Sequence, residues 1–177
     1  MFDCSEQEKL DKVVECFNGC FAEPENTLLK TGAKEPFYLA AKDGNQAIIY
    51  SREDFLSSAL HEIAHWCIAG RERRNLDDFG YWYKPEGRSQ QEQSNFESVE
   101  IKPQAIEWAL SLACKHNFNL SADNLVKGMQ ASEAFRQNVE HQLKEYLNNN
   151  SLPERAKILF EAFGKIFEYS MEEQYCV

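Results

Sequence analysis

Two of the four histidines in this chain, His61 and His65, lie four residues apart in the pentapeptide HEIAH. In an α-helix this spacing places both imidazole rings on one face, one turn apart and within reach of a single cation. Imidazole nitrogen suits zinc, iron, copper or nickel. The spacing therefore predicts two ligands of a metal ion. It leaves open whether that ion serves a zinc hydrolase or an iron oxygenase.

The apolar residues around this pentapeptide indicate a largely buried helix. At about 100° per residue, one stripe of the helix collects Leu56, Ala59, Leu60, Ile63 and Cys67. His61 and His65 lie nearly opposite this stripe, so we expect both rings to face a cavity rather than open water. Glu62 lies about 100° from His61 around the helix. That offset favours a role in proton transfer or beside the metal over a role as ligand.

A catalytic metal centre generally needs a third protein ligand. His116, His141 and several carboxylates are the candidates. Glu97 and Glu100 lie in a predicted helix whose apolar stripe is formed by Phe96, Val99, Ile106 and Leu110. Glu100 lies roughly 85° from the centre of that stripe and Glu97 roughly 145°. The helical phase therefore lets Glu100 face inward and directs Glu97 to solvent.

The elements that must position these residues follow from apolar periodicity and turn residues. Helices are expected over 6–21, from an N-cap at Ser51 to about Ala69, from about Ser89, from Ser121, over 132–148 and over 153–169. Pro103 must kink or restart the helix that begins near Ser89. Residues 22–46 read as loops and turns, except that two short strands, 37–40 and 47–50, form a predicted hairpin around Gly44.

These elements place the chain in the α+β class. We expect one mostly helical domain over residues 1–177, with a small antiparallel sheet and the HEIAH helix at its centre. The connection over 71–88 is long for a compact domain, which favours a functional loop. It holds five of the 19 basic residues, a local concentration that suits an acidic protein partner.

The charge balance excludes several classes of function. The 177-residue chain has 29 acidic and 19 basic side chains and a net charge of −10, which argues against a binder of nucleic acid or membrane surfaces. It has no apolar run of about 18 residues or more, and its acidic N-terminus does not resemble a secretory signal. The six cysteines form no C-x-x-C pair. We therefore expect a cytoplasmic monomer with free thiols.

Three stretches of the chain resemble the elongation factor P hydroxylase family. They are SALHEIAHWCIAG over 58–70, DFGYWY over 78–83 with the following Pro85 and Gly87-Arg88, and FESVEIKPQA over 96–105. Weaker similarity extends the resemblance over nearly the whole chain. The family hydroxylates a lysine of the translation factor after β-lysylation has extended that lysine.

The resemblance implies what the site contains. It implies a non-heme, iron-dependent monooxygenase that uses dioxygen as co-substrate and elongation factor P as its protein partner. The implied ligands map onto His61, His65 and Glu100, in agreement with the helical phase, and zinc remains the alternative metal. For such a substrate, the loop residues expected to bind are Arg73, Arg74, Asp78, Tyr81, Trp82, Tyr83 and Arg88.

Two alternatives remain open. In a zinc peptidase, His61, His65 and Glu100 would bind zinc and Glu62 would activate a bound water as general base. In a non-enzymatic module, the metal would only stabilise a binding domain. Metal identity together with the product separates these hypotheses. Iron with dioxygen consumption supports hydroxylation, and zinc with peptide cleavage supports the peptidase.

Overall fold

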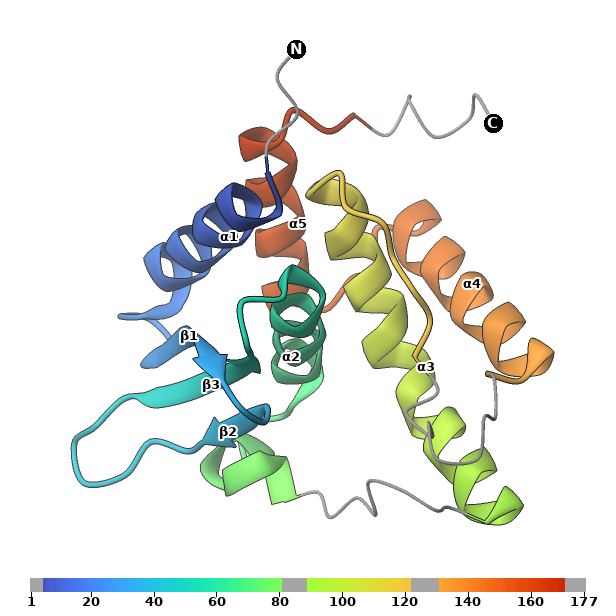
Figure 1. Cartoon of the computed structure of the whole chain (residues 1–177), viewed down its shortest axis with the longest axis horizontal. Coiled ribbons are helices and arrows are strands. Elements are labelled where there is room, and N and C mark those ends of the chain that lie inside the picture. The colour runs from blue at the N-terminus through green and yellow to red at the C-terminus, as the bar shows by residue number, and fades with distance from the viewer. Residues whose placement is uncertain (1–4, 81–88, 122–130, 171–177) are drawn as a thin grey trace.

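Helix α2 (Leu56–Ile68), which carries the HEIAH pentapeptide, runs through the middle of the molecule (Figure 1). The computed structural model describes residues 5–80, 89–121 and 131–170. Within these ranges the other α-helices are α1 (Glu6–Phe21), α3 (Gln90–Ala113), α4 (Glu133–Asn148) and α5 (Glu154–Ile166), and two short 3-10 helices, η1 (Arg73–Asn75) and η2 (Asp77–Gly80), follow α2. The strands are β1 (Thr27–Ala33), β2 (Phe37–Leu39) and β3 (Ala47–Arg52). The mostly helical α+β class is confirmed.

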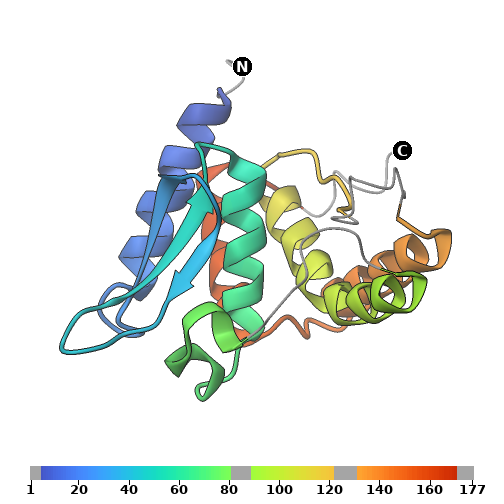
Figure 2. The same cartoon turned by 60° about the horizontal axis from the view of Figure 1, so that its bottom comes forward.

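The elements form two groups around α2. The sheet and α1 lie on one side of it, and α3 and α4 lie on the other (Figures 1 and 2). The predicted apolar stripe of α2 is confirmed, since Ala59, Leu60 and Ile63 are fully buried. The predicted N-cap is wrong, because Ser51 belongs to β3 and α2 begins after Phe55. Because β3 extends to Arg52, its backbone pairs with β1 along its whole length. A helix that began at Ser51 would remove the last of these hydrogen bonds.

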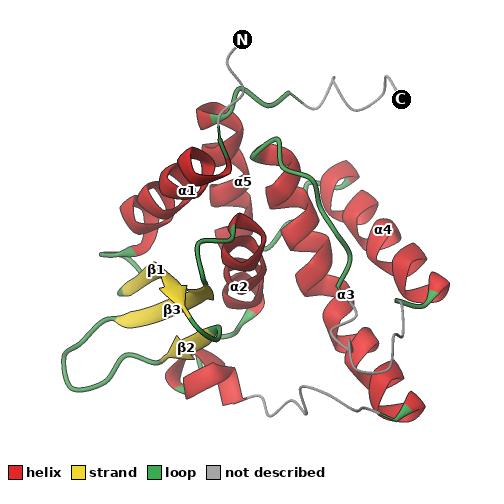
Figure 3. Ribbon diagram, in the orientation of Figure 1, coloured by secondary structure: helices red, strands yellow, loops and turns green. Residues whose placement is uncertain are grey.

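The sheet has three strands in the order β1-β3-β2, all on one side of the molecule (Figure 3). The predicted antiparallel pairing of β2 with β3 is confirmed. Strand β1 pairs parallel to β3 and falls in a segment predicted to be loops. A side chain from α1 stabilises it, because Asn18 accepts from the backbone N–H of Leu29 and donates to its carbonyl. Such partners lie outside the local sequence, which explains the missed strand.

Helix α3 supplies the wall opposite the histidines. Ser89 and Glu92 form its capping box. The helix continues through Pro103 and does not restart there. Val99 is 49% exposed, so its assignment to the apolar stripe is wrong, whereas Glu100 is 1% exposed. The buried face of α3 is thus rotated toward its acidic residues, and this rotation aims Glu100 at α2.

Helices α4 and α5 complete the support. Ser132 caps the N-terminus of α4 and its hydroxyl donates to Glu97 at 2.7 Å, so Glu97 joins α3 to α4 instead of pointing to solvent. Arg155 of α5 donates to the carbonyls of Trp66, Cys67 and Ala69 and anchors the end of α2. The short helix predicted from Ser121 falls almost entirely on residues 122–130, which, like the tail over 171–177, lie outside the described residues. No helix in the described ranges is long and apolar enough to cross a membrane.

Candidate metal centre

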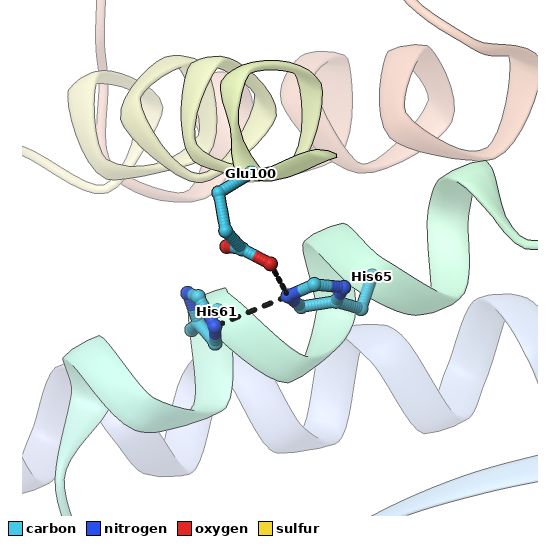
Figure 4. A group of neighbouring side chains, drawn as sticks. All are labelled: His61, His65 and Glu100. Atoms are coloured by element: carbon cyan, nitrogen blue, oxygen red, sulfur yellow. Dashed lines mark hydrogen bonds and ion pairs between the residues drawn. The ribbon is translucent and has the colours of Figure 1, made fainter. Parts of the chain in front are cut away.

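Three side chains from α2 and α3 meet in the middle of the fold. The Nε2 atoms of His61 and His65 lie 3.1 Å apart. Nε2 of His65 lies 3.4 Å from Oε1 of Glu100 (Figure 4). Among the described residues, these three offer a set of ligand atoms that all lie within 4.8 Å of one another. The faces that the sequence predicted for the histidines of α2 and for Glu100 of α3 thus meet at one site.

The geometry of this set fits a metal ion. Two nitrogens bound about 2.1 Å from one ion and at right angles to each other lie about 3.0 Å apart. The separation of 3.1 Å between the two Nε2 atoms matches this value. Two imidazoles and one carboxylate are the donor set of non-heme iron sites and also suit catalytic zinc. The site can therefore hold one divalent metal, and its donor set accepts either ion.

Glu100 contributes negative charge to this centre. Burial by itself raises the pKa of Glu100. The hydrogen bond and charge of His65, followed by the charge of His61 and the hydrogen bond from Gln104, outweigh burial and lower that pKa. The Gln104 amide donates to Oε2 of Glu100 at 3.4 Å and to the carbonyl of Ser121 at 2.8 Å. The lowered pKa favours the ionised form of Glu100. Gln104 binds Oε2, the oxygen that does not face His65, and so leaves Oε1 for a metal.

The sequence reasoning missed a fourth side chain, Glu107. Its Oε2 lies 2.8 Å from Nδ1 of His61, and the Glu107 side chain is 7% exposed. Burial alone lowers the pKa of His61, but Glu107, with smaller contributions from Glu62 and Glu100, raises it to about 10. When His61 is neutral, a proton on Nδ1 leaves the Nε2 lone pair for a metal. The seven-residue spacing from Glu100 to Glu107, about two helical turns, was the available signal.

Glu62 lies beside the centre and outside its ligand set. Burial raises the pKa of Glu62; the two histidines oppose this effect, and Glu100 and Asp78 add to it. A carboxylic acid with a raised pKa retains its proton closer to neutral pH and can deliver it. This position suits the predicted role in proton transfer.

The other histidine candidates lie in separate surroundings. His116 contacts Glu6 at 3.1 Å near the start of α1. His141 is 78% exposed on α4 and lies 3.9 Å from Glu145. Neither belongs to the cluster of ligand atoms. Glu100 is thus the candidate that meets both histidines of α2.

The structure separates the predicted substrate-binding residues. Arg74 pairs with Glu25 at 2.6 Å and its Cζ lies 5.6 Å from the ring centroid of Trp66, so it faces into the fold. Asp78 accepts from the backbone N–H of Tyr38 at 2.8 Å. Arg73 is exposed and donates to the carbonyl of Phe79. The remaining four, Tyr81, Trp82, Tyr83 and Arg88, lie outside the described residues.

Comparisons with known proteins show which family this chain belongs to. The family model described as elongation factor P hydroxylase matches residues 16–175. A curated relative, the elongation factor P lysine hydroxylase of Haemophilus influenzae, is 47% identical over 168 residues. The match covers 94% of this chain and 93% of the relative. The residues matched by the family model include both α2 and α3.

Proposed function

Because the chain belongs to the elongation factor P hydroxylase family, we propose that it is a monooxygenase that hydroxylates the β-lysylated lysine of elongation factor P. The observation that carries this proposal is the meeting of His61, His65 and Glu100. Two histidines and one carboxylate leave several positions of a metal open. Chemistry with dioxygen would need such open positions, whereas a purely structural zinc site has none.

The residues of this chain have distinct parts in the proposed reaction. His61, His65 and Glu100 would hold iron(II), which when bound supplies the activation of dioxygen needed to oxidise a C–H bond. One oxygen atom enters the substrate, the other leaves as water, and an external reductant supplies two electrons. Glu107 orients His61 through its Nδ1. Glu62, with its raised pKa, supplies or accepts a proton next to the centre.

Mass spectrometry of the translation factor tests this proposal. We expect modified elongation factor P to gain the mass of one oxygen atom when incubated with the iron-loaded protein, dioxygen and a reductant. His65→Ala should abolish the gain. His141→Ala is a matched control, because that histidine lies on the exposed face of α4. An unchanged mass with the wild-type protein would rule out the proposed activity.

A zinc peptidase is the second candidate, because Glu62 lies next to the two histidines, as a general base of that class does. Its proton affinity is raised by burial. In that reading the same three ligands bind zinc. Metal analysis of purified protein, with parallel assays for peptide cleavage and oxygen uptake, separates the candidates. Cleavage by the zinc form without oxygen uptake would favour the peptidase.

The rest of the proposal concerns the setting of the reaction. We propose that residues 1–177 act as one domain and as a monomer in the cytoplasm, where the translation factor is modified. The partner is a protein. Neither nucleic acid nor a membrane surface is part of the proposal, since the chain carries a net charge of −10.

A further inference from the structure

A hollow of about 430 Å³ begins at His65 and follows the end of α2. Beyond Ile68 and Gly70, its wall is formed by Arg71, Glu72 and Arg73. The hollow therefore extends from His65, a proposed metal ligand, to the first residues of the connection over 71–88 that is rich in basic residues. If a side chain of a protein substrate reached the proposed metal from this side, the surface of that substrate would contact Arg71, Glu72 and Arg73.

The wall of this hollow is firmly held. Arg155 donates to the Ala69 carbonyl at 2.7 Å, and the backbone N–H of Arg74 donates to the Gly70 carbonyl at 3.1 Å. The side chain of Arg74 faces inward, toward Glu25. The neighbouring arginines, Arg71 and Arg73, are exposed. The turn after α2 thus directs Arg74 inward and leaves Arg71 and Arg73 exposed at the rim, where Arg73 also donates to the carbonyl of Phe79.

Charges of opposite sign lie near the two ends of the hollow. Its inner end is lined by His65, whose Nε2 lies 3.4 Å from the buried carboxylate of Glu100. At the rim two arginines accompany one glutamate in a chain whose net charge is −10. A ligand that complements both ends has a cationic group for the inner end and anionic groups around it. An amine-bearing lysine side chain among acidic residues has this pattern.

Resting on the proposed function, we propose that Arg71 and Arg73 bind acidic residues that flank the target lysine on the surface of the protein substrate. The target side chain enters the hollow, and the acidic residues remain at the rim. Such contacts speed association and set the orientation of the partner. They contribute to recognition of the intact protein and take no part in the oxidation itself.

A double charge reversal, Arg71→Glu with Arg73→Glu, tests this surface. KM should be measured for the intact modified protein and for a short peptide that carries the modified lysine without acidic neighbours. We expect KM for the intact protein to rise by about 10-fold or more, while kcat and the KM of the peptide change by less than about two-fold. Lys165→Glu is the matched control, because Lys165 is exposed on α5.

Salt and metal content supply independent readouts. KM of the wild-type protein for the intact substrate should rise with ionic strength, and the double variant should lose most of this dependence. Cobalt(II) titration should show the same metal affinity in both proteins. An unchanged KM in the double variant would overturn the rim proposal and leave the hydroxylase proposal intact. A fall in kcat together with lost metal would also overturn it, because the arginines would then support the centre.

A binding measurement distinguishes failure of the proposed hydroxylase activity from failure of the proposal about Arg71 and Arg73. If the wild-type protein does not hydroxylate the factor, calorimetric titration of the modified factor into both proteins tests the rim alone. Binding by the wild type and loss of binding by the double variant would support the rim. Equal binding would overturn it, and no binding by the wild type would overturn both proposals.

Discussion

Nδ1 of His61 lies 2.8 Å from Oε2 of Glu107, so a carboxylate of α3 orients a histidine of α2. The two residues are 46 positions apart in the chain, and Glu107 is buried. A hydrogen bond of this kind selects the tautomer and the ring orientation of a ligating histidine. The packing of α3 against α2 therefore shapes the proposed metal centre through Glu107 as well as through Glu100.

Loss of Glu107 should weaken metal binding. We expect Glu107→Ala to lower the affinity for cobalt(II) about 10- to 100-fold, because His61 loses the acceptor for its Nδ1 proton. Glu107→Gln retains an oxygen acceptor and should recover part of the loss. Titration against a competing chelator measures the affinities. Glu161→Ala, an exposed change on α5, is the control, and wild-type affinity in Glu107→Ala would refute the role.

Loss of the Glu100 charge should have a larger effect. Glu100→Gln keeps the size of the side chain but offers a metal a neutral amide in place of a carboxylate. We expect the affinity for cobalt(II) to fall by more than about 100-fold, which is the upper end of the effect for residues that only hydrogen-bond to a metal ligand. Hydroxylation should fall with it, while circular dichroism shows a folded protein. Metal affinity similar to that of Glu107→Ala would place Glu100 outside the ligand set.

Glu62→Gln separates the two candidate reactions. A peptidase loses its general base in this variant, and the loss of such a group costs roughly 100-fold or more in rate. In the hydroxylase we expect metal to be retained and turnover to fall by less than that, because the metal ligands are intact. Parallel assays of metal content and turnover provide the answer. Nearly complete loss of activity with full metal content would favour the peptidase.

Loss of Arg155 should destabilise the fold without removing any of the proposed metal-ligating atoms. The guanidinium holds three carbonyls at the end of α2, and its Cζ lies 4.5 Å from the ring centroid of Trp66. A hydrogen bond from a charged group contributes about 1.5–3 kcal/mol, and the three contacts share one nitrogen, Nη2, so their contributions do not add in full. We therefore expect Arg155→Ala to lower the free energy of unfolding by about 2–4 kcal/mol. Urea denaturation measures this, with exposed Arg136→Ala as the control, and a loss below about 0.5 kcal/mol would contradict it.

Much of the local structure could be predicted from the sequence. The predicted range of α1 is confirmed, and that of α4 agrees within one residue, because each has a serine cap and apolar residues at helical spacing. The i, i+4 spacing of His61 and His65 puts both rings on one face of any helix that contains them. The inward position of Glu100 followed from the same arithmetic and is confirmed by its burial. Regular helix geometry makes such predictions depend on neighbouring residues alone.

Other features depended on partners far away in the chain. Ser51 has the residue type of a helix cap, yet it lies in β3, where the backbone pairs with β1. Strand β1 has few local signals and depends on β3 and on Asn18. Val99 fits an apolar stripe by spacing and is exposed. In each case pairing or packing outweighed local preference.

The sequence by itself determined the residue types of the proposed metal ligands, the face of α2 that carries the two histidines and the family to which the chain belongs. Only the tertiary structure decided which carboxylates meet the histidines. It placed Glu100 next to His65 and Glu107 next to His61, and it turned Arg74 into the fold, away from the rim. The reason is physical: helix periodicity acts within one element, whereas the distance between donor atoms on two helices is set by how those helices pack.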